Sequence, residues 1–294
     1  MSSTEPTQIF DYPFNYIPSF AAGVTFVVLF SFVTGLHLGQ ALHRRMWWLL
    51  PTVVTGGIGE TIGWVGRLWG SKDPISMDPY LMQITTTIIS PTFVLAANFV
   101  IVIRIIQKLG PQYSRLSPRL YTIVFCSCDV IALIVQSVGG AMASLAKDQP
   151  GIERGGHIAL GGIVFQFASI VVYMVLTSEF LIRSYLDRPF THRRDTFIGG
   201  FPRVDFETKQ MIFGVSFSSL CMFIRGVYRT IELTDGWGGK IISNELLFIG
   251  FDGSMIILSM AVLNVFHPGR LMTGEIGLMR LASRVDIEMF SKGI

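Results

Sequence analysis

The chain alternates between long apolar stretches and short polar connections, and seven of the apolar stretches are long enough to cross a membrane. A spanning helix needs roughly 20 mostly apolar residues, because each residue of an α-helix advances about 1.5 Å through about 30 Å of hydrocarbon. Prolines such as Pro51, Pro118 and Pro268 lie near the expected helix ends. The seven predicted helices lie near residues 17–36, 47–66, 82–106, 120–145, 158–182, 211–231 and 246–266.

The composition agrees with a membrane protein. Half of the 294 residues are hydrophobic, only 15% are charged, and the mean hydropathy is +0.53. A water-soluble domain normally has about a quarter of its residues charged. These values argue against an ordinary cytosolic enzyme, a disordered chain or a disulfide scaffold. We therefore predict an all-α membrane protein that is a bundle of seven transmembrane helices.

The N-terminal segment and the positions of the cysteines add to this prediction. No basic segment precedes the first apolar stretch, so we expect that stretch to remain as a helix rather than to be cleaved as a signal peptide. The three cysteines all lie within apolar stretches, and we expect neither a disulfide nor a metal knuckle.

The basic residues are distributed unevenly between the two sets of connections. One set contains five lysines and arginines and the other contains sixteen. Basic residues are retained on the cytoplasmic side of membrane proteins, so the N-terminus is predicted outside and the C-terminus inside. We predict an extracellular segment over 1–16, a membrane domain over 17–266 and a cytoplasmic tail over 267–294. Because topology explains the net charge of +3, no nucleic-acid partner is expected.

Two segments on the predicted cytoplasmic side have distinctive sequences. The longest connection, 183–210, carries the charged stretch DRPFTHRRD, and it is where we would expect a cytoplasmic partner. The tail contains LMTGEIGLMRLASRVDIEMF, in which apolar residues have loosely helical spacing. This tail either lies on the inner membrane surface as an amphipathic helix or extends freely.

Several polar residues lie inside the predicted spans, where burial of a charge costs several kcal/mol. Arg225 and Arg229 are four residues apart and so lie on one helix face. An acid of another helix, Asp252 or Glu60, is the expected counter-ion of Arg225. Asp129 lies separately, in the predicted inner half. The polar residues that share the predicted outer half are Glu60, Gln136, Gln166, Arg225, Arg229 and Asp252.

The shared depth of these residues supports two interpretations. They can be interhelical ion pairs and hydrogen bonds that only hold the bundle together. Alternatively, they form an outward-open polar pocket with apolar walls that receives an ion or the head of an amphiphile. Nearby glycines are expected to serve close helix packing rather than ligand contact. These glycines are Gly56, Gly57, Gly59, Gly63 and Gly66 in one helix and Gly139 and Gly140 in another.

Other seven-helix functions require residues that this chain lacks. A retinal protein needs a lysine within the membrane, and all six lysines lie in connections. The motifs of rhodopsin-type receptors are missing, and no fingerprint of an ATP site is present. His37 and His267 lie at inner helix ends, but a zinc hydrolase site there would still need a third ligand, for which Glu179 is a remote candidate. We expect no metal site and no cofactor.

The order of short motifs along the chain is similar to that of a known family. These motifs are YIPS at 16–19, HLGQ at 37–40, GETIGWVGR at 59–67, SP at 90–91, DVIALIVQSVGG at 129–140, GGIVFQ at 161–166, IRGVYRTIE at 224–232, an acid pair at Glu245 and Asp252, and FHPG at 266–269. The chain resembles the fungal lipid-translocating exporters, seven-helix proteins of the 7-aminocholesterol resistance or sphingoid long-chain base resistance type. The resemblance extends from about residue 14 to residue 270.

The resemblance implies a fungal membrane protein that exports or translocates amphiphilic lipids, such as sphingoid bases and sterol-like toxicants, and so confers resistance to them. It implies membrane lipids and amphiphilic small molecules as partners and the plasma membrane as the location, with the vacuolar or endoplasmic reticulum membrane as alternatives. A receptor-like lipid or stress sensor that signals through cytoplasmic loops is a second hypothesis. An intramembrane lipid hydrolase is a third, although we do not expect an enzyme.

Residue positions that match the family overlap with those found by depth. The candidate ligand-binding residues are Glu60, Arg67, Gln136, Gln166, Arg225, Tyr228, Arg229, Glu232 and Asp252. Without an ATP site, movement of substrate must run downhill or be coupled to protons. The candidate proton-coupling residues are Glu60, Asp129 and Asp252.

Overall fold

The computed structural model describes residues 13–146, 148–190, 205–236 and 239–271. Within these ranges the protein contains no strand, and 84% of it is helical, which confirms the predicted all-α fold. Most of the 183–210 connection and the amphipathic pattern of the tail lie outside the described residues.

The helices follow the order of the predicted spans. Their bounds are α1 Phe20–His43, α2 Thr55–Gly70, α3 Met77–Leu109, α4 Pro118–Leu145, α5 Gln149–Tyr185, α6 Phe206–Thr234, α7 Glu245–Phe248, α8 Ser254–Val265 and α9 Pro268–Leu271. Among the described residues, six helical stretches are long and apolar enough to cross a membrane. They are α1, α3, α4, α5, α6 and the continuous stretch Glu245–Val265 that contains α7 and α8.

The second predicted span differs most from the sequence prediction. It begins with a 3-10 turn, Trp47–Leu49, and a π turn, η2, over Leu50–Val54. Pro51 lacks an N–H and cannot continue an α-helix regularly, and Thr52 has non-helical dihedral angles (φ −114°, ψ −105°). The α-helix itself, α2, starts at Thr55 and has 16 residues, too few to count alone as a span.

Several helices extend beyond the predicted apolar stretches. Helix α2 continues to Gly70, so Arg67 lies in its last turn. The hydropathy pattern predicted that Arg67 lies in the following connection. Helix α5 starts at Gln149, well before the predicted position 158. Hydropathy detects only the part of a helix that hydrocarbon surrounds, whereas polar end turns remain helical through their backbone hydrogen bonds.

Side chains cap several helices at their N-termini. Ser19 Oγ accepts a hydrogen bond from the Ala22 N–H at the start of α1, and Ser117 Oγ does the same for Leu120 at the start of α4. Asn244 accepts from two N–H groups at the start of α7. Such caps satisfy N–H groups that have no partner within the helix and so define where each span begins.

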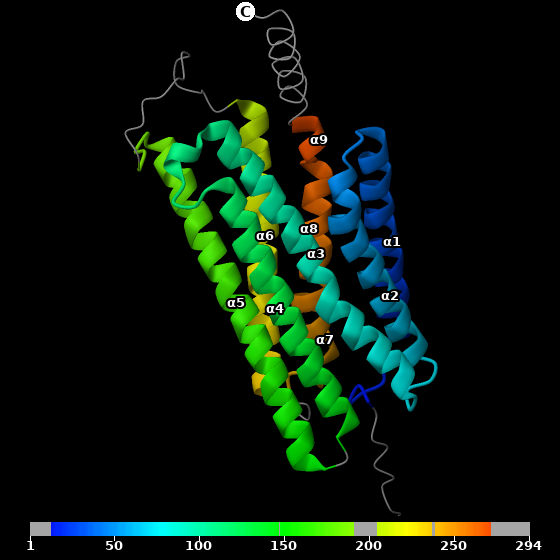
Figure 1. Ribbon diagram of the computed structural model, residues 1–294. Coiled ribbons are helices and arrows are strands. Elements are labelled where there is room, and N and C mark those ends of the chain that lie inside the picture. Colours follow the sequence, from blue (N-terminus) through cyan, green and yellow to red (C-terminus); the bar gives the residue numbers. More distant parts are fainter. Residues whose placement is uncertain (1–12, 147, 191–204, 237–238, 272–294) are drawn as a thin grey trace, which may run out of the picture.

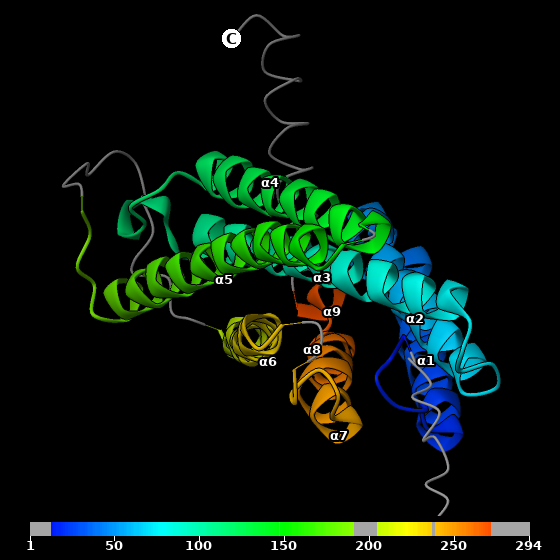
Figure 2. The same ribbon diagram turned by 90° about the horizontal axis from the view of Figure 1, so that it is seen from below.

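Helix α3 is central in the bundle. Figures 1 and 2 show α4 and α5 on one side of it and α1 and α2 on the other, while α6 and α8 pack together across one face. In the most apolar section of α3, 61% of the residues are buried, against 28% in α4. Helix α4 is therefore peripheral, and polar residues on its inward face lie near the lipid boundary.

Small residues bring two helix pairs into backbone contact. A Cβ atom added to Gly139 on α4 would overlap the backbone nitrogen of Ala159 on α5. A Cβ on Gly56 of α2 would lie 2.9 Å from the Ser90 carbonyl oxygen of α3. The predicted packing role is confirmed for these glycines, but it is wrong for Gly140, which has no neighbouring atom within 4 Å of its Cβ position.

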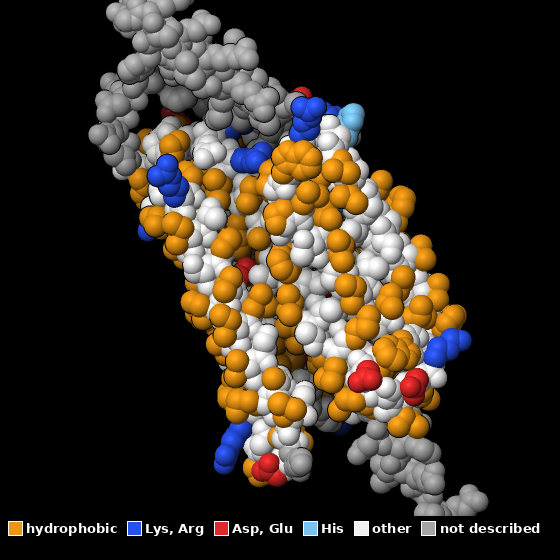
Figure 3. Space-filling view, turned by 45° about the vertical axis from the view of Figure 1, so that its right-hand side comes forward, with side chains coloured by type: hydrophobic (Ala, Val, Ile, Leu, Met, Phe, Trp, Pro, Cys, Tyr) orange, Lys and Arg blue, Asp and Glu red, His pale blue; other side chains and the backbone are white. Residues whose placement is uncertain are grey.

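The molecular surface has the character expected of a protein surrounded by lipid. Figure 3 shows hydrophobic side chains covering the lateral face, with charged side chains gathered toward the two ends. Large apolar residues such as Phe32, Ile123 and Val175 are exposed along α1, α4 and α5. A soluble monomer rarely exposes so continuous an apolar surface. The chain is an integral membrane protein.

Candidate functional site

A buried polar cluster is centred on α6, α3 and the span that contains α7 and α8. Arg225, Arg229 and Glu232 follow one another on α6 at intervals of four and three residues, so they lie on the same face of the helix. Asp252 lies opposite, in a π turn, η4, over Ile249–Gly253. Such single π turns within α-helices are frequent at functional sites.

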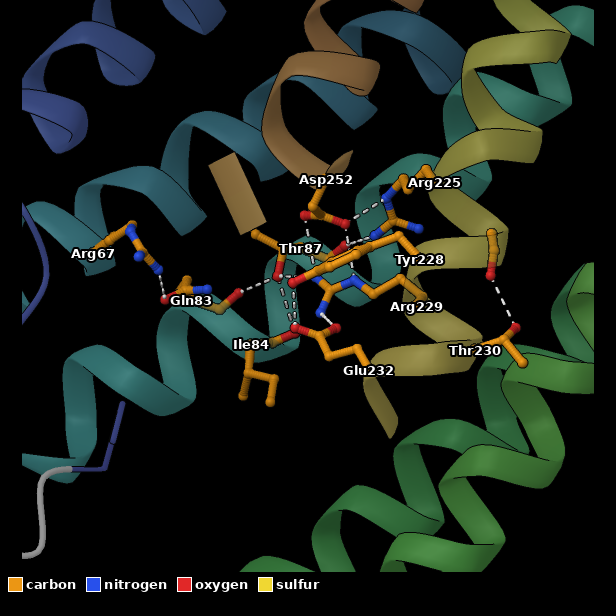
Figure 4. Close-up of polar contacts among 11 residues, drawn as sticks. Arg67, Gln83, Ile84, Thr87, Arg225, Tyr228, Arg229, Thr230, Glu232 and Asp252 are labelled. Atoms are coloured by element: carbon orange, nitrogen blue, oxygen red, sulfur yellow. Dashed lines mark hydrogen bonds and ion pairs between the residues drawn. The ribbon is translucent and has the colours of Figure 1, made fainter. Parts of the chain in front are cut away.

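Arg229 is the centre of this cluster (Figure 4). Its Nε and Nη2 atoms donate to the two carboxylate oxygens of Asp252 at 2.8 and 3.2 Å. Its Nη1 atom donates to Glu232 Oε2 at 2.8 Å. Nη2 also donates to Thr87 Oγ1 on α3 at 3.4 Å. The guanidinium is therefore held by two acids and by a third helix, and its planar fork matches the carboxylate of Asp252.

Arg225 shares the same acid. Its Nε atom lies 2.8 Å from Asp252 Oδ1, in an ion pair, and its Nη2 atom donates to the Thr87 carbonyl oxygen at 2.8 Å. Of the two counter-ions that the sequence allowed, Asp252 is the one in contact. Glu232 in turn accepts a hydrogen bond from the Tyr228 hydroxyl at 2.9 Å.

Glu60 is the one member of the cluster with no hydrogen bond to the rest. It lies on α2 with 0% of its surface exposed, and neither carboxylate oxygen has a hydrogen-bond partner among the described residues. It is within electrostatic range of Asp252, Arg225 and Arg229. With Glu232, the cluster contains three carboxyl groups and two guanidinium groups. The cluster therefore has one carboxyl group more than it has guanidinium groups. Because unpaired buried charge is unfavourable, one additional proton or one bound cation would stabilise the cluster.

A narrow cavity of about 30 Å³ lies beside the two arginines, between α3, α4, α5 and α6. Gln136 and Gln166 line it together with Arg225 and Arg229. Gln136 Nε2 donates to Gln166 Oε1 at 2.9 Å, and Gln166 Nε2 donates to Thr92 Oγ1 at 3.1 Å. The cavity is large enough for about two water molecules. The glutamines thus extend the polar cluster toward the α4–α5 pair.

Arg67 belongs to a second, neighbouring cluster. It is 1% exposed, and its Nη2 atom donates to the Tyr16 hydroxyl at 2.6 Å and to Glu245 Oε1 at 2.9 Å. Its Nη1 atom donates to Gln83 Oε1 at 3.2 Å. This arginine therefore joins α2 to α3, to α7 and to the segment that precedes α1.

Aromatic rings surround the Arg67 guanidinium. The Phe14, Tyr16, Trp64 and Phe248 ring centres lie between 4.7 and 5.9 Å from its central carbon. Cation–π attraction is strongest in such desolvated surroundings. The Phe248 ring also lies 5.3 Å from the Arg229 guanidinium, so it separates the two arginine clusters and contacts both.

Residues 13–19 cover the polar clusters at the end of the bundle where α1 begins. Pro13, Phe14 and Tyr16 line a cavity of about 30 Å³, with Arg229 and Glu232 among the residues on its other side. The Ser19 N–H donates to Glu245 Oε1 at 2.8 Å, which holds the segment down. Burial raises the pKa of the Tyr16 hydroxyl, and the nearby Arg67 offsets only part of that rise. The outward-open pocket, one of the two interpretations of the sequence, stays a hypothesis, and in this structure Glu60 and Asp252 are 0% exposed.

The weak metal candidates do not form a site with three ligands. His37 Nε2 lies 3.0 Å from the Met260 carbonyl oxygen and within electrostatic range of His267. Glu179 is held elsewhere, by Arg115 and Arg183, whose Nε atoms lie 2.5 and 2.9 Å from its carboxylate oxygens. In the part of the chain that the structure describes, no three His, Cys, Asp or Glu residues are placed to hold a metal ion.

The structure brings together most of the residues predicted from the sequence, but not all. Arg225, Tyr228, Arg229, Glu232, Asp252 and Glu60 form one cluster, Gln136 and Gln166 border it, Arg67 lies in the neighbouring cluster, and Asp129 lies apart. The sequence argument missed Thr87 and Gln83, which are uncharged and lie near the predicted start of the third span. It also left Tyr16 and Glu245 out of the site, although the family motifs include both positions.

Comparison with known proteins identifies a family and several relatives. The family described as RTA1 like protein matches residues 53–275. The sphingoid long-chain base transporter RSB1 of Saccharomyces cerevisiae is 28% identical over 283 residues, covering 88% of this chain and 74% of its own. Protein RTA1 of the same species is 25% identical, covering 87% and 84%. The probable lipid transporter atnI of Emericella nidulans is 28% identical, covering 88% and 68%. No solved structure matches.

Proposed function

The chain belongs to the RTA1-like family, and from this membership and its buried charges we propose that it exports amphiphilic lipids with a cationic head across a membrane. Two relatives carry transporter names, one for sphingoid long-chain bases and one for lipids. A sphingoid base has a protonated amine on a single apolar chain. We propose sphingoid bases, and sterol-like toxicants with an amine, as the substrates whose export confers resistance.

The observation that carries this proposal is the charge imbalance around Glu60. The cluster has one more carboxyl group than guanidinium groups, and the extra carboxyl group, Glu60, has no hydrogen-bond partner among the described residues. A bound ammonium group supplies the missing positive charge and the missing hydrogen-bond donors in one step. A neutral head cannot do so.

In the proposed mechanism, the ammonium head enters the cluster while the hydrocarbon tail remains in lipid. The head pairs with Glu60 and competes with Arg225 for Asp252, because Arg225 contacts Asp252 through a single nitrogen whereas Arg229 contacts it through two. Either a proton or the ammonium head can neutralise the Glu60 carboxylate, but not both at once. Exchange of one for the other would couple lipid movement to protons, with Glu60 and Asp252 as the exchanging groups.

We further propose the plasma membrane and an orientation with the N-terminus outside. At the end of the bundle that contains the starts of α4 and α6, the described basic residues include Arg44, Arg45, Arg104, Lys108, Arg115, Arg119, Arg183, Arg188 and Lys209. At the opposite end they are Lys72, Arg154 and Lys240, apart from the buried Arg67. The positive-inside rule places the first group in the cytoplasm. Residues 13–19 would then close the cluster from outside.

The test is transfer of a fluorescent sphingoid base between the leaflets of liposomes that contain the purified protein. We expect the wild type to accelerate transfer and Glu60→Gln and Asp252→Asn to lower the protein-dependent rate at least tenfold, because each removes a negative charge from the cluster. Glu153→Gln is the matched control, since Glu153 is exposed near the start of α5. It should transfer the base at the wild-type rate.

Normal transfer by folded Glu60→Gln and Asp252→Asn would contradict the assignment of the site. No acceleration by the folded wild type would contradict export itself and favour a lipid sensor. The same liposomes, extracted after the assay, distinguish a hydrolase, because an enzyme would convert an added sphingolipid to products that mass spectrometry detects.

A further inference from the structure

Asp129 is a buried carboxyl group outside the cluster. It lies on α4, in the half of the helix that begins at Pro118, and only 2% of its surface is exposed. Neither of its oxygens has a hydrogen-bond partner among the described residues, and no charged residue of the described chain acts appreciably on it. An unpartnered carboxyl group inside a membrane protein is unfavourable and indicates a function.

The register of the α4–α5 pair places a hydroxyl group opposite this carboxyl. The two helices are antiparallel, and contacts pair Gly139 with Ala159 and Phe125 with Tyr173. The same register pairs Asp129 with Ser169. Ser169 is buried, and its Oγ atom also lacks a hydrogen-bond partner among the described residues. A carboxyl group and a hydroxyl group thus face the same seam, and neither is satisfied by the described protein.

The polar seam continues from Asp129 to the arginine cluster. Gln136 follows Asp129 by seven residues on α4, which is two turns or about 10 Å along the same helix face. Gln166 precedes Ser169 by three residues on α5. Gln136 and Gln166 hydrogen-bond to each other and line the cavity beside Arg225. Polar side chains therefore lie in sequence between the inner half of α4 and the site proposed above.

Asp129 also lies close to the lipid. Helix α4 packs mainly against α5 and, less extensively, against α3. The two residues that follow Asp129, Val130 and Ile131, are 53% and 51% exposed. An amphiphile in the bilayer needs to pass only the edge of one peripheral helix to reach the carboxyl group.

We propose that Asp129 and Ser169 form a second binding site, which receives the ammonium head of a single-chain amphiphile before it reaches the Glu60 cluster. The inference rests on the proposed export function and adds an entry site to it. Asp129 supplies the negative charge, and Ser169 supplies a hydroxyl group that pairs with the amine or with a hydroxyl group of the lipid head. The tail remains in lipid beside α4.

The test uses dicyclohexylcarbodiimide, an apolar reagent that modifies neutral carboxyl groups within membranes. The full-length protein in lipid nanodiscs is treated with the reagent, and peptide mass spectrometry measures the adduct at Asp129, Glu60 and Glu179. We expect an adduct at Asp129 that sphinganine, a sphingoid base, suppresses at least fivefold. N-acetylsphinganine, which has the same chain and a neutral head, should not suppress it. Glu179, held in two ion pairs, is the control carboxyl group.

Two variants test the role of the hydroxyl group. Ser169→Ala should raise the half-protecting concentration of sphinganine about fivefold, the effect of losing one hydrogen bond. Ser144→Ala is the matched control, because Ser144 is exposed on α4 and bonds only to the Gly140 carbonyl of its own helix. It should leave the half-protecting concentration unchanged.

The outcomes separate this inference from the proposed function. No adduct at Asp129 in nanodiscs without added sphinganine would overturn the inference, because a site that an amphiphile can enter must also admit the reagent. Equal protection by sphinganine and N-acetylsphinganine, or none by either, would overturn it as well and would leave at most a proton at Asp129. Neither result bears on the Glu60 site. That site is tested separately by the leaflet-transfer assay, which varies Glu60 and leaves Asp129 unchanged.

Discussion

At the scale of single residues, Arg229 and Arg225 have different roles although they are one helical turn apart. Arg229 binds Asp252 through two nitrogens and Glu232 through the third, and its guanidinium lies 5.3 Å from the centre of the Phe248 ring. Arg225 makes one ion pair with Asp252, and its side chain borders the cavity. We infer that Arg229 mainly holds the helices together, whereas Arg225 is the arginine that a substrate can displace.

This difference predicts a difference in stability. Arg229→Ala should destabilise the protein by about 3–5 kcal/mol, because it leaves Asp252 and Glu232 buried with fewer partners. Thermal unfolding in detergent measures the effect, with the exposed Arg154→Ala as the control. Arg225→Ala should lower stability less than Arg229→Ala. Equal losses for the two variants would show that the arginines are structurally equivalent.

The sequence could predict the charged members of the site and their depth, because a charge within an apolar stretch is conspicuous. It could not predict Thr87, which contacts both arginines through a side-chain oxygen and a carbonyl oxygen. Threonine is common in membrane helices, and nothing in its spacing marks it as a ligand. The choice of Asp252 over Glu60 as counter-ion also required the three-dimensional structure, since both acids lie at a similar depth.

At the scale of helices, close packing of small residues positions the polar side chains. The backbone contact of α4 with α5 around Gly139 and Ala159 aligns Gln136 with Gln166 a turn away. The π turn η4 redirects the chain so that Asp252 faces both arginines. Both features determine where the charged residues meet.

The α4–α5 contact supports a prediction with a built-in control. Gly139→Leu should lower the midpoint of thermal unfolding markedly, because its side chain would overlap the α5 backbone, which cannot move aside without separating the helices. Gly140→Leu, at a position with open space, should change the midpoint little. Thermal unfolding that is monitored by size-exclusion chromatography measures the midpoint for both variants. A stable Gly139→Leu protein would contradict the backbone contact described for this pair.

The sequence predicted the order of the spans and the role of Gly139, but not the form of the second helix. Its helical stretch begins at Trp47, as predicted, but as a 3-10 turn and a π turn that precede α2. Pro51 lies within a stretch that is uniformly apolar, so hydropathy could not show that α2 begins only at Thr55. The role of Gly140 was also wrong, because spacing alone cannot show which of two adjacent glycines faces the neighbouring helix.

At the scale of the whole molecule, the charged clusters are buried in the described structure. Residues 13–19 lie over the clusters at one end, and Glu60 and Asp252 are 0% exposed. The proposed export would therefore require that this segment, held by Tyr16 and Ser19, move away at some stage. No apolar pattern in the sequence indicates that this segment folds back over the bundle, because its contacts are with residues far away along the chain.

The most direct test of the central claim compares heads that differ only in charge. Wild-type protein in liposomes should accelerate the leaflet transfer of a fluorescent sphingoid base, and it should not accelerate transfer of the N-acetylated form of the same molecule, because only the ammonium group balances Glu60. Glu60→Gln should remove this preference. Equal acceleration of the charged and neutral lipids by the wild type would contradict the claim that the unbalanced carboxyl group selects the substrate.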